Sequence, residues 1–136
     1  MADYETDVAF YQRYNYAATA NMRKELVNLM NEIIDDLYEN HYDELYHENA
    51  FRRIKGKQIS LPNEMLPKEM SDFILSMGKG YLCNSGLNTT LIDPEKINLE
   101  IQHIWATDSE ENDYNPPHSH FGLMSGVFYL KVPPQV

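Results

Sequence analysis

Two histidines near the C-terminal end of the chain, His118 and His120, have the residue type and spacing of a metal site. Side chains two residues apart on an extended segment point to the same side, so both imidazoles can reach one metal ion. Imidazole binds Fe(II), Zn, Ni and Cu, and the ligand type alone therefore does not name the metal. The preceding prolines, Pro116 and Pro117, stiffen the approach and lower the entropic cost of fixing the pair.

Other residues with reactive side chains give weaker signals. His41 and His47 are six residues apart and do not share one helical face, which disfavours a metal site there. Cys83 is the only cysteine, and a lone cysteine is most often a small buried apolar residue. His103 precedes the pair and is predicted to be structural. The glycine-rich stretch 78–86 lacks the spacing of a phosphate-binding loop and is predicted to be a helix end followed by a loop.

Composition restricts the class of protein. The chain has 136 residues, which fits one domain with its own core. Its formal net charge of -10 disfavours broad nucleic-acid binding, because that affinity rests on clustered Lys and Arg. A single Cys excludes an intramolecular disulfide and favours a reducing compartment. No signal peptide and no apolar run of membrane-spanning length is present, so we expect a cytoplasmic protein.

Two amphipathic helices are predicted before residue 93. The first covers residues 18–39, where apolar side chains recur at steps of three and four and where Thr19 or Asn21 could cap the start. Its apolar stripe consists of Met22, Leu26, Leu29, Ile33 and Leu37. The second begins at Pro67 and runs to about Tyr81, until glycines interrupt it. Its apolar face consists of Met70, Phe73, Ile74 and Met77.

Strands are predicted mainly after residue 93, where the apolar period changes to two. Residues 97–103 alternate apolar and polar side chains, and this half-buried strand extends through Trp105. A second strand covers residues 125–132 and is stopped by two prolines. Shorter strands are predicted at residues 10–16 and 52–61. The single domain 1–136 thus divides into a helical layer, 1–93, and core strands, 94–136.

The block around the histidine pair resembles a known family. Ile104-Trp105-Ala106 is followed by residues 113–120 (DYNPPHSH) and then by residues 123–133 (LMSGVFYLKVP). This order resembles the central block of the prolyl 4-hydroxylase-like 2-oxoglutarate- and Fe(II)-dependent oxygenases of bacteria and phages. The match covers about a quarter of the chain and corresponds to the N-terminal portion of such an enzyme.

The resemblance implies a fold and an activity. The fold would be α+β, with N-terminal helices packed on a double-stranded β-helix (jelly roll). His118 and His120 would hold Fe(II), and Tyr129 would contact 2-oxoglutarate. The enzyme would convert 2-oxoglutarate and O2 to succinate and CO2 while hydroxylating a C–H bond, in the cytoplasm of a bacterial or phage-infected cell. The substrate stays open among peptides, amino acids, sugar nucleotides and lipid precursors.

The sequence departs from the family pattern in two ways. Most relatives have His-x-Asp or His-x-Glu, so direct metal binding by His120 stays open, and Glu100 or Asp113 is an alternative carboxylate. The family also has a distal His and an Arg that pairs with the carboxylate of 2-oxoglutarate. No His follows His120 and no Arg follows Arg53. We therefore expect the jelly roll to be incomplete and to continue past Val136, and this chain alone to be inactive.

Two alternatives compete with the dioxygenase. A cupin-like protein would also use a His-x-His pair, but cupins place a Glu soon after it, where this chain has Met124 and Ser125. A non-catalytic binding or assembly module is the other alternative, supported by the tyrosine-rich residues 1–16. An uncovered edge on the strand 127–132 would favour homo-oligomers.

Overall fold

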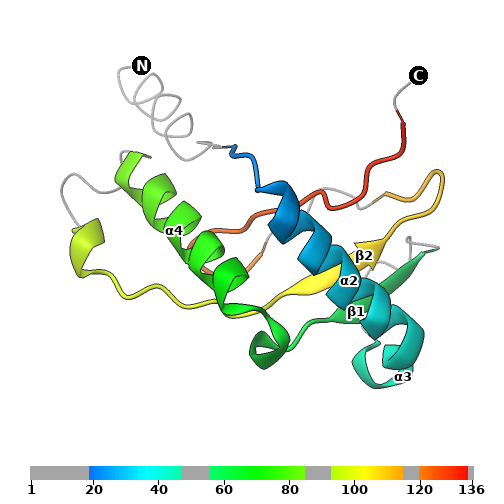
Figure 1. The fold of residues 1–136 in the computed structure, drawn as a ribbon. Helices are drawn as coiled ribbons and strands as arrows, with labels where there is room; N and C mark the ends of the chain where they lie inside the picture. Colours follow the sequence, from blue (N-terminus) through cyan, green and yellow to red (C-terminus); the bar gives the residue numbers. More distant parts are fainter. Residues whose placement is uncertain (1–18, 47–55, 85–92, 115–119, 135–136) are drawn as a thin grey trace, which may run out of the picture. The chain divides into compact units, whose positions relative to one another are not determined.

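The computed structural model describes residues 19–46, 56–84, 93–114 and 120–134. Within these ranges the elements are, in chain order, helix α2 (Lys24–Asn40), helix α3 (Tyr42–Leu45), strand β1 (Lys57–Ser60), the 3-10 turn η1 (Asn63–Met65), helix α4 (Lys68–Asn84), the 3-10 turn η2 (Pro94–Lys96) and strand β2 (Trp105–Asp108) (Figure 1). The chain divides into two compact units, residues 1–21 with 71–100 and residues 22–70 with 101–136.

The predicted jelly roll is wrong for the described residues. They form a small α+β structure whose sheet has two antiparallel strands, β1 and β2. The predicted strand at 97–105 is observed only from Trp105, and residues 120–134 contain no strand. A strand requires a neighbour to pair its backbone groups, and β1 supplies one only for the four residues of β2, with one further bond from the Leu61 amide to the Ile104 carbonyl (2.9 Å).

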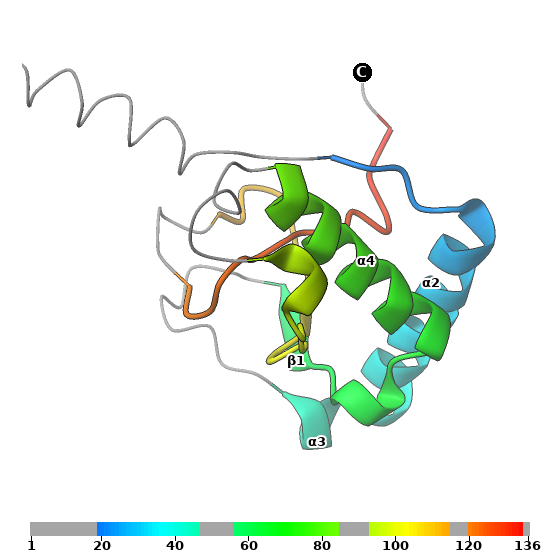
Figure 2. The same cartoon turned by 90° about the vertical axis from the view of Figure 1, so that its left-hand side faces the viewer.

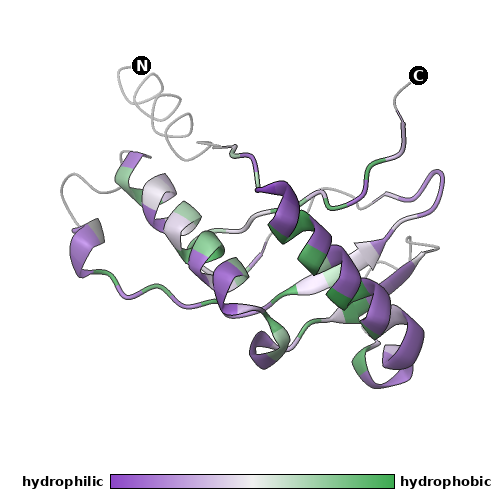
Figure 3. Cartoon of the chain, viewed as in Figure 1, coloured by the Kyte–Doolittle hydropathy of each residue, from purple (hydrophilic) through white to green (hydrophobic). Residues whose placement is uncertain are grey.

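Helix α2 forms where its apolar stripe was predicted. Leu26 and Leu37 are buried as expected, and Met30 is buried in place of Leu29, which is 36% exposed. Polar and apolar residues alternate around the helix (Figure 3), and its polar side is exposed. Neither Thr19 nor Asn21 caps the start, because the N-cap position is Arg23 and has no side-chain cap. The amphipathic pattern thus predicted the helix, but not its first residue.

Helix α4 continues through the glycines that were predicted to end it. It includes Gly78 and Gly80 and reaches Asn84, whose side-chain amide donates to the Gly80 carbonyl (2.7 Å). A glycine inside a helix costs about 1 kcal/mol relative to alanine, which burial of apolar side chains can offset. Met70 and Leu82 are buried, while Phe73 is partly buried. No described helix combines the length and the apolarity needed to cross a bilayer.

The β1–β2 ribbon and helix α2 form the core of the second unit. The paired residues are Lys57 with Asp108, Gln58 with Thr107, Ile59 with Ala106, and Ser60 with Trp105. Helix α2 lies along one face of the ribbon in both views (Figures 1 and 2). Ile59 is fully buried and Leu61 is 3% exposed, as alternate residues of one strand facing a core should be.

The Tyr38 hydroxyl connects α2 to both strands by hydrogen bonds. Its hydroxyl lies 3.0 Å from the Lys57 carbonyl and 3.0 Å from the Ala106 carbonyl, which are on different strands. Desolvation, and then the negative charge of Asp108, raise the pKa of Tyr38 to about 12. The neutral phenol is therefore the form that the folded protein favours.

Replacing Tyr38 by phenylalanine should reduce the free energy of unfolding by about 1–2 kcal/mol near neutral pH, because the hydroxyl contacts with β1 and β2 are lost. Because the pKa of Tyr38 is raised in the folded state, its contribution to stability is fully present below the unfolded pKa of 10.0. This contribution is lost as the pH rises towards the folded pKa of about 12. The difference between parent and Tyr38→Phe should therefore shrink from pH 10 to pH 12. Urea titrations across this range measure it, and a constant difference would contradict the role of the hydroxyl.

Candidate functional site

The strand register separates the ribbon into two faces. Directly opposed residues of an antiparallel pair point to the same side, and successive residues alternate. The face opposite to Ile59 therefore carries Gln58, Ser60, Trp105 and Thr107, which we call the polar face. The polar face includes the tryptophan of the sequence block that suggested a metal enzyme.

Trp105 brings two histidines together on the polar face. Its ring stacks on His120, with 5.5 Å between centroids and 29° between planes. His103 contacts the same indole at 5.3 Å and 34°. His120 is exposed, and Trp105 is 38% exposed. The contact therefore fixes the plane of an imidazole at the surface.

The other half of the predicted metal pair, His118, lies outside the described residues. Within the described ranges, no group of three or more His, Cys, Asp or Glu side chains is arranged to hold a metal ion. His103, predicted to be structural, is exposed beside Trp105. The described part of the site thus consists of His120, its indole neighbour and the polar face.

Gln58 is the feature of the polar face that the sequence did not indicate. It is 8% exposed, and its side-chain oxygen Oε1 is buried without a hydrogen-bond partner in the described part of the chain. Buried polar atoms are nearly always paired, so an unpaired acceptor requires an explanation. Gln58 is separated from Trp105 by 47 positions along the chain, and only the strand register places them on one face.

The two alternative carboxylates, Asp113 and Glu100, belong to different compact units of the chain. Asp113 closes a turn, because its Oδ2 accepts the backbone amides of Gly56 (2.9 Å) and Glu110 (2.8 Å). Those bonds explain Asp113 as a structural tie between the segment before β1 and the loop after β2. Glu100 is exposed and belongs to the other compact unit.

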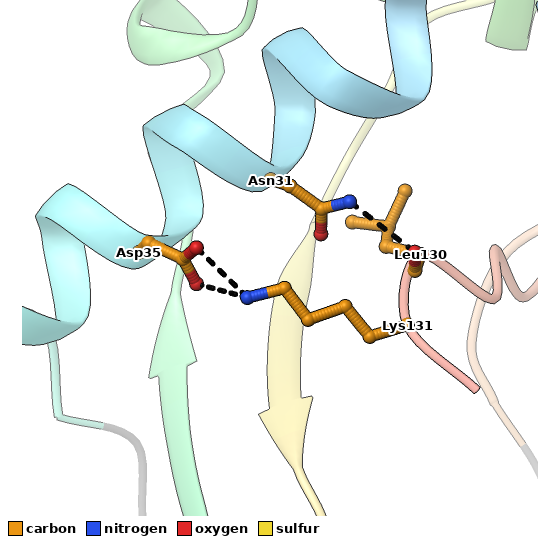
Figure 4. Close-up of polar contacts among 4 residues, drawn as sticks. All are labelled: Asn31, Asp35, Leu130 and Lys131. Atoms are coloured by element: carbon orange, nitrogen blue, oxygen red, sulfur yellow. Dashed lines mark hydrogen bonds and ion pairs between the residues drawn. The ribbon is translucent and has the colours of Figure 1, made fainter. Parts of the chain in front are cut away.

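The segment 120–134 is attached to helix α2 by polar contacts (Figure 4). The Asn31 side-chain amide donates to the Leu130 carbonyl (3.2 Å), and Lys131 Nζ lies 2.6 and 2.8 Å from the carboxylate oxygens of Asp35. Tyr129, the predicted contact for 2-oxoglutarate, is 79% exposed. Its phenol is accessible, although its segment is not the strand that was predicted.

The remaining candidates belong to other segments of the chain. His41 follows α2, with Nδ1 at 3.6 Å from the carboxylate of Glu44, and His47 is outside the described residues. Cys83 is exposed near the end of α4, so the prediction that it would be buried is wrong. A shallow hollow on α4 is lined by Phe73, Met77 and Tyr81 among others and contains none of the predicted site residues.

Comparison with known proteins adds no relative. No protein-family model, no curated protein and no solved structure matches the chain. The function is therefore argued from the residues and their geometry.

The described residues fit an imidazole-bound metal in two respects. A metal binds a histidine through the lone pair in the plane of the ring, whereas Trp105 covers the ring face of His120, so stacking and coordination are compatible. A metal-bound imidazole also donates its second ring N–H to an acceptor, commonly a carbonyl or carboxylate. The buried Oε1 of Gln58, on the same face as Trp105, is such an acceptor.

Proposed function

We propose that His118 and His120 bind the iron of a 2-oxoglutarate-dependent dioxygenase. The observation that carries the proposal is the stacking of Trp105 on His120, because it joins in space the tryptophan and the histidine motif of the sequence block. The ordered match of that block, from Ile104 to Pro133, supports the same family. The proposal concerns the metal site and the reaction class.

Each residue has a defined task in this proposal. His118 and His120 supply the ring nitrogens, and Trp105 holds the His120 ring in one plane so that little entropy is lost on binding. Tyr129, whose hydroxyl is accessible, donates to a carboxylate oxygen of 2-oxoglutarate. Fe(II), when bound, couples the oxidative decarboxylation of 2-oxoglutarate to oxidation of a substrate C–H bond. We place this site in the cytoplasm, on the basis of the lone Cys83 and the family resemblance.

Residues 121–136 contain no further His and no Arg. The proposed reaction needs a third metal ligand and a cation for the cosubstrate carboxylate. We therefore expect residues 1–136 to bind Fe(II) or Mn(II) without forming succinate by themselves.

Removal of either histidine should abolish most metal binding. In anaerobic calorimetric titrations with Fe(II), and in titrations with Mn(II), His118→Ala and His120→Ala should each weaken affinity by at least about 100-fold, because even loss of an outer-shell partner costs 10–100-fold. His41→Ala is the matched control, since it removes a histidine whose Nδ1 lies 3.6 Å from the carboxylate of Glu44. Equal affinities for the parent, His120→Ala and His41→Ala would exclude the proposed site.

A second candidate function, a non-catalytic binding module, has its own supporting observation. The segment 120–134 exposes several large apolar side chains, and exposed apolar patches mark interaction surfaces. They are Phe121 (103%), Leu123 (56%), Val127 (74%), Tyr129 (79%) and Val132 (59%). Sedimentation of the metal-free protein separates the two functions: a stable dimer that His118→Ala and metal leave unchanged would favour the module.

A further inference from the structure

We infer that Gln58 is a positioning residue for the metal site, whose side-chain carbonyl accepts a hydrogen bond from the His120 imidazole when metal is bound. This inference rests on the proposed function. It adds a residue from a different part of the chain to the His118–His120 pair.

The strand register places Gln58 and Trp105 on the same face of the ribbon. Ser60 is directly opposite Trp105, and Gln58 is the next residue of β1 on the same face. Diagonal neighbours on one face of an antiparallel pair have Cβ atoms about 7 Å apart, which long side chains span. The His120 ring is stacked on Trp105, with 5.5 Å between centroids, so the indole that touches the imidazole is a diagonal neighbour of Gln58 on this face.

The side-chain oxygen of Gln58 is buried without a hydrogen-bond partner in the described part of the chain. Gln58 is only 8% exposed, yet its Oε1 has no hydrogen-bond partner among the described residues. An unpaired buried acceptor destabilises the fold, and a methionine of similar shape would avoid the penalty. Residues that destabilise the ligand-free fold are typically found at functional sites, where they make a favourable contact once the ligand is bound.

The chemistry of the acceptor carries the third step. The carbonyl oxygen of an amide only accepts hydrogen bonds, and the second ring nitrogen of a metal-bound imidazole donates one. That bond would fix which ring nitrogen faces the metal. Gln58 would therefore act through His120 and would not touch the metal itself.

Opposite effects on stability and on metal affinity distinguish a positioning residue from a structural one. Gln58→Met should raise the thermal midpoint of the metal-free protein by a few degrees, roughly 2–6 °C, because the unpaired acceptor is removed. The same variant should weaken Mn(II) affinity about 10- to 100-fold. Gln58→Glu keeps an acceptor oxygen and should retain the parent affinity. Gln102→Met, at an exposed glutamine, is the matched control and should change neither quantity.

The outcomes separate this inference from the proposed function. If His120→Ala loses Mn(II) and Gln58→Met keeps it, the inference is overturned while the metal site stands. If His120→Ala keeps Mn(II), both are overturned. A Gln58→Met protein that is less stable or unfolded without metal also overturns the inference, because Gln58 would then support the metal-free fold. Loss of affinity with a higher midpoint, rescued by Gln58→Glu, is the result expected.

Discussion

Replacing Gly56 by alanine should reduce the free energy of unfolding by about 3 kcal/mol or more, because overpacking against a fixed neighbour costs at least 1–3 kcal/mol. A Cβ at Gly56 would overlap the Asp108 carbonyl oxygen and lie 2.7 Å from the carbonyl carbon. Both atoms are backbone of β2, so they cannot move without shifting the ladder. Displacement of Gly56 would also weaken its amide bond to Asp113.

Urea unfolding followed by the fluorescence of Trp105, the only tryptophan, measures this effect. Gly80→Ala is the matched control, because a Cβ there meets no atom within 4 Å and Gly80 lies inside α4. That variant should gain roughly 0.5–1 kcal/mol, the propensity difference between alanine and glycine in a helix. A Gly56→Ala protein as stable as Gly80→Ala would show that β2 does not approach residue 56 this closely.

Ile59→Ala is expected to have the second large effect, a loss of about 2–5 kcal/mol. Ile59 is fully buried, and the deleted methyl and methylene groups would leave a cavity in the core of the second unit. Its strand is held by β2 on one edge and by the bridge to Tyr46 on the other, so the backbone has little room to collapse into the space. Ile59→Val should cost only about 0.5–1.5 kcal/mol.

Val127→Ala controls for the removal of an apolar side chain as such. Val127 is 74% exposed, and its truncation should change the free energy of unfolding by less than about 0.5 kcal/mol. In chemical denaturation, the free energy of unfolding should therefore be much lower for Ile59→Ala than for Ile59→Val. That of Ile59→Val should in turn be lower than that of Val127→Ala. If Ile59→Ala and Val127→Ala unfolded at the same urea concentration, the assignment of Ile59 to the core would be incorrect.

The two long helices were predictable because helix signals are local. The spacing of Leu26 and Leu37 indicates α2, and the face that includes Met70 indicates α4. The error at Gly78 and Gly80 arose because propensity was weighed without tertiary burial, which carries the helix on to Asn84. Local signals therefore identified these elements but misplaced the start of α2 and the end of α4.

Strands were predicted less well because a strand depends on a distant partner. The alternation at residues 97–103 is real in the sequence, but the residues that pair with β1 in this part of the chain are 105–108. The histidine motif and Trp105 could be grouped because they are near in sequence. Gln58 is distant in sequence and could not be assigned to the same group. Its place on the polar face follows from the register between β1 and β2, and no local pattern encodes that register.

The attachment of the segment 120–134 to α2 would couple the metal affinity of the proposed site to the docking of this segment. The Asp35–Lys131 ion pair is exposed on both sides and joins residues 96 positions apart, so it contributes little stability while closing a long loop. His120, which stacks on Trp105, belongs to the same segment, so the contacts with α2 help to keep it there. The apparent dissociation constant for a metal is the intrinsic constant divided by the docked fraction. Anything that binds or releases the segment at Leu130 and Lys131 therefore tunes the proposed site from a distance.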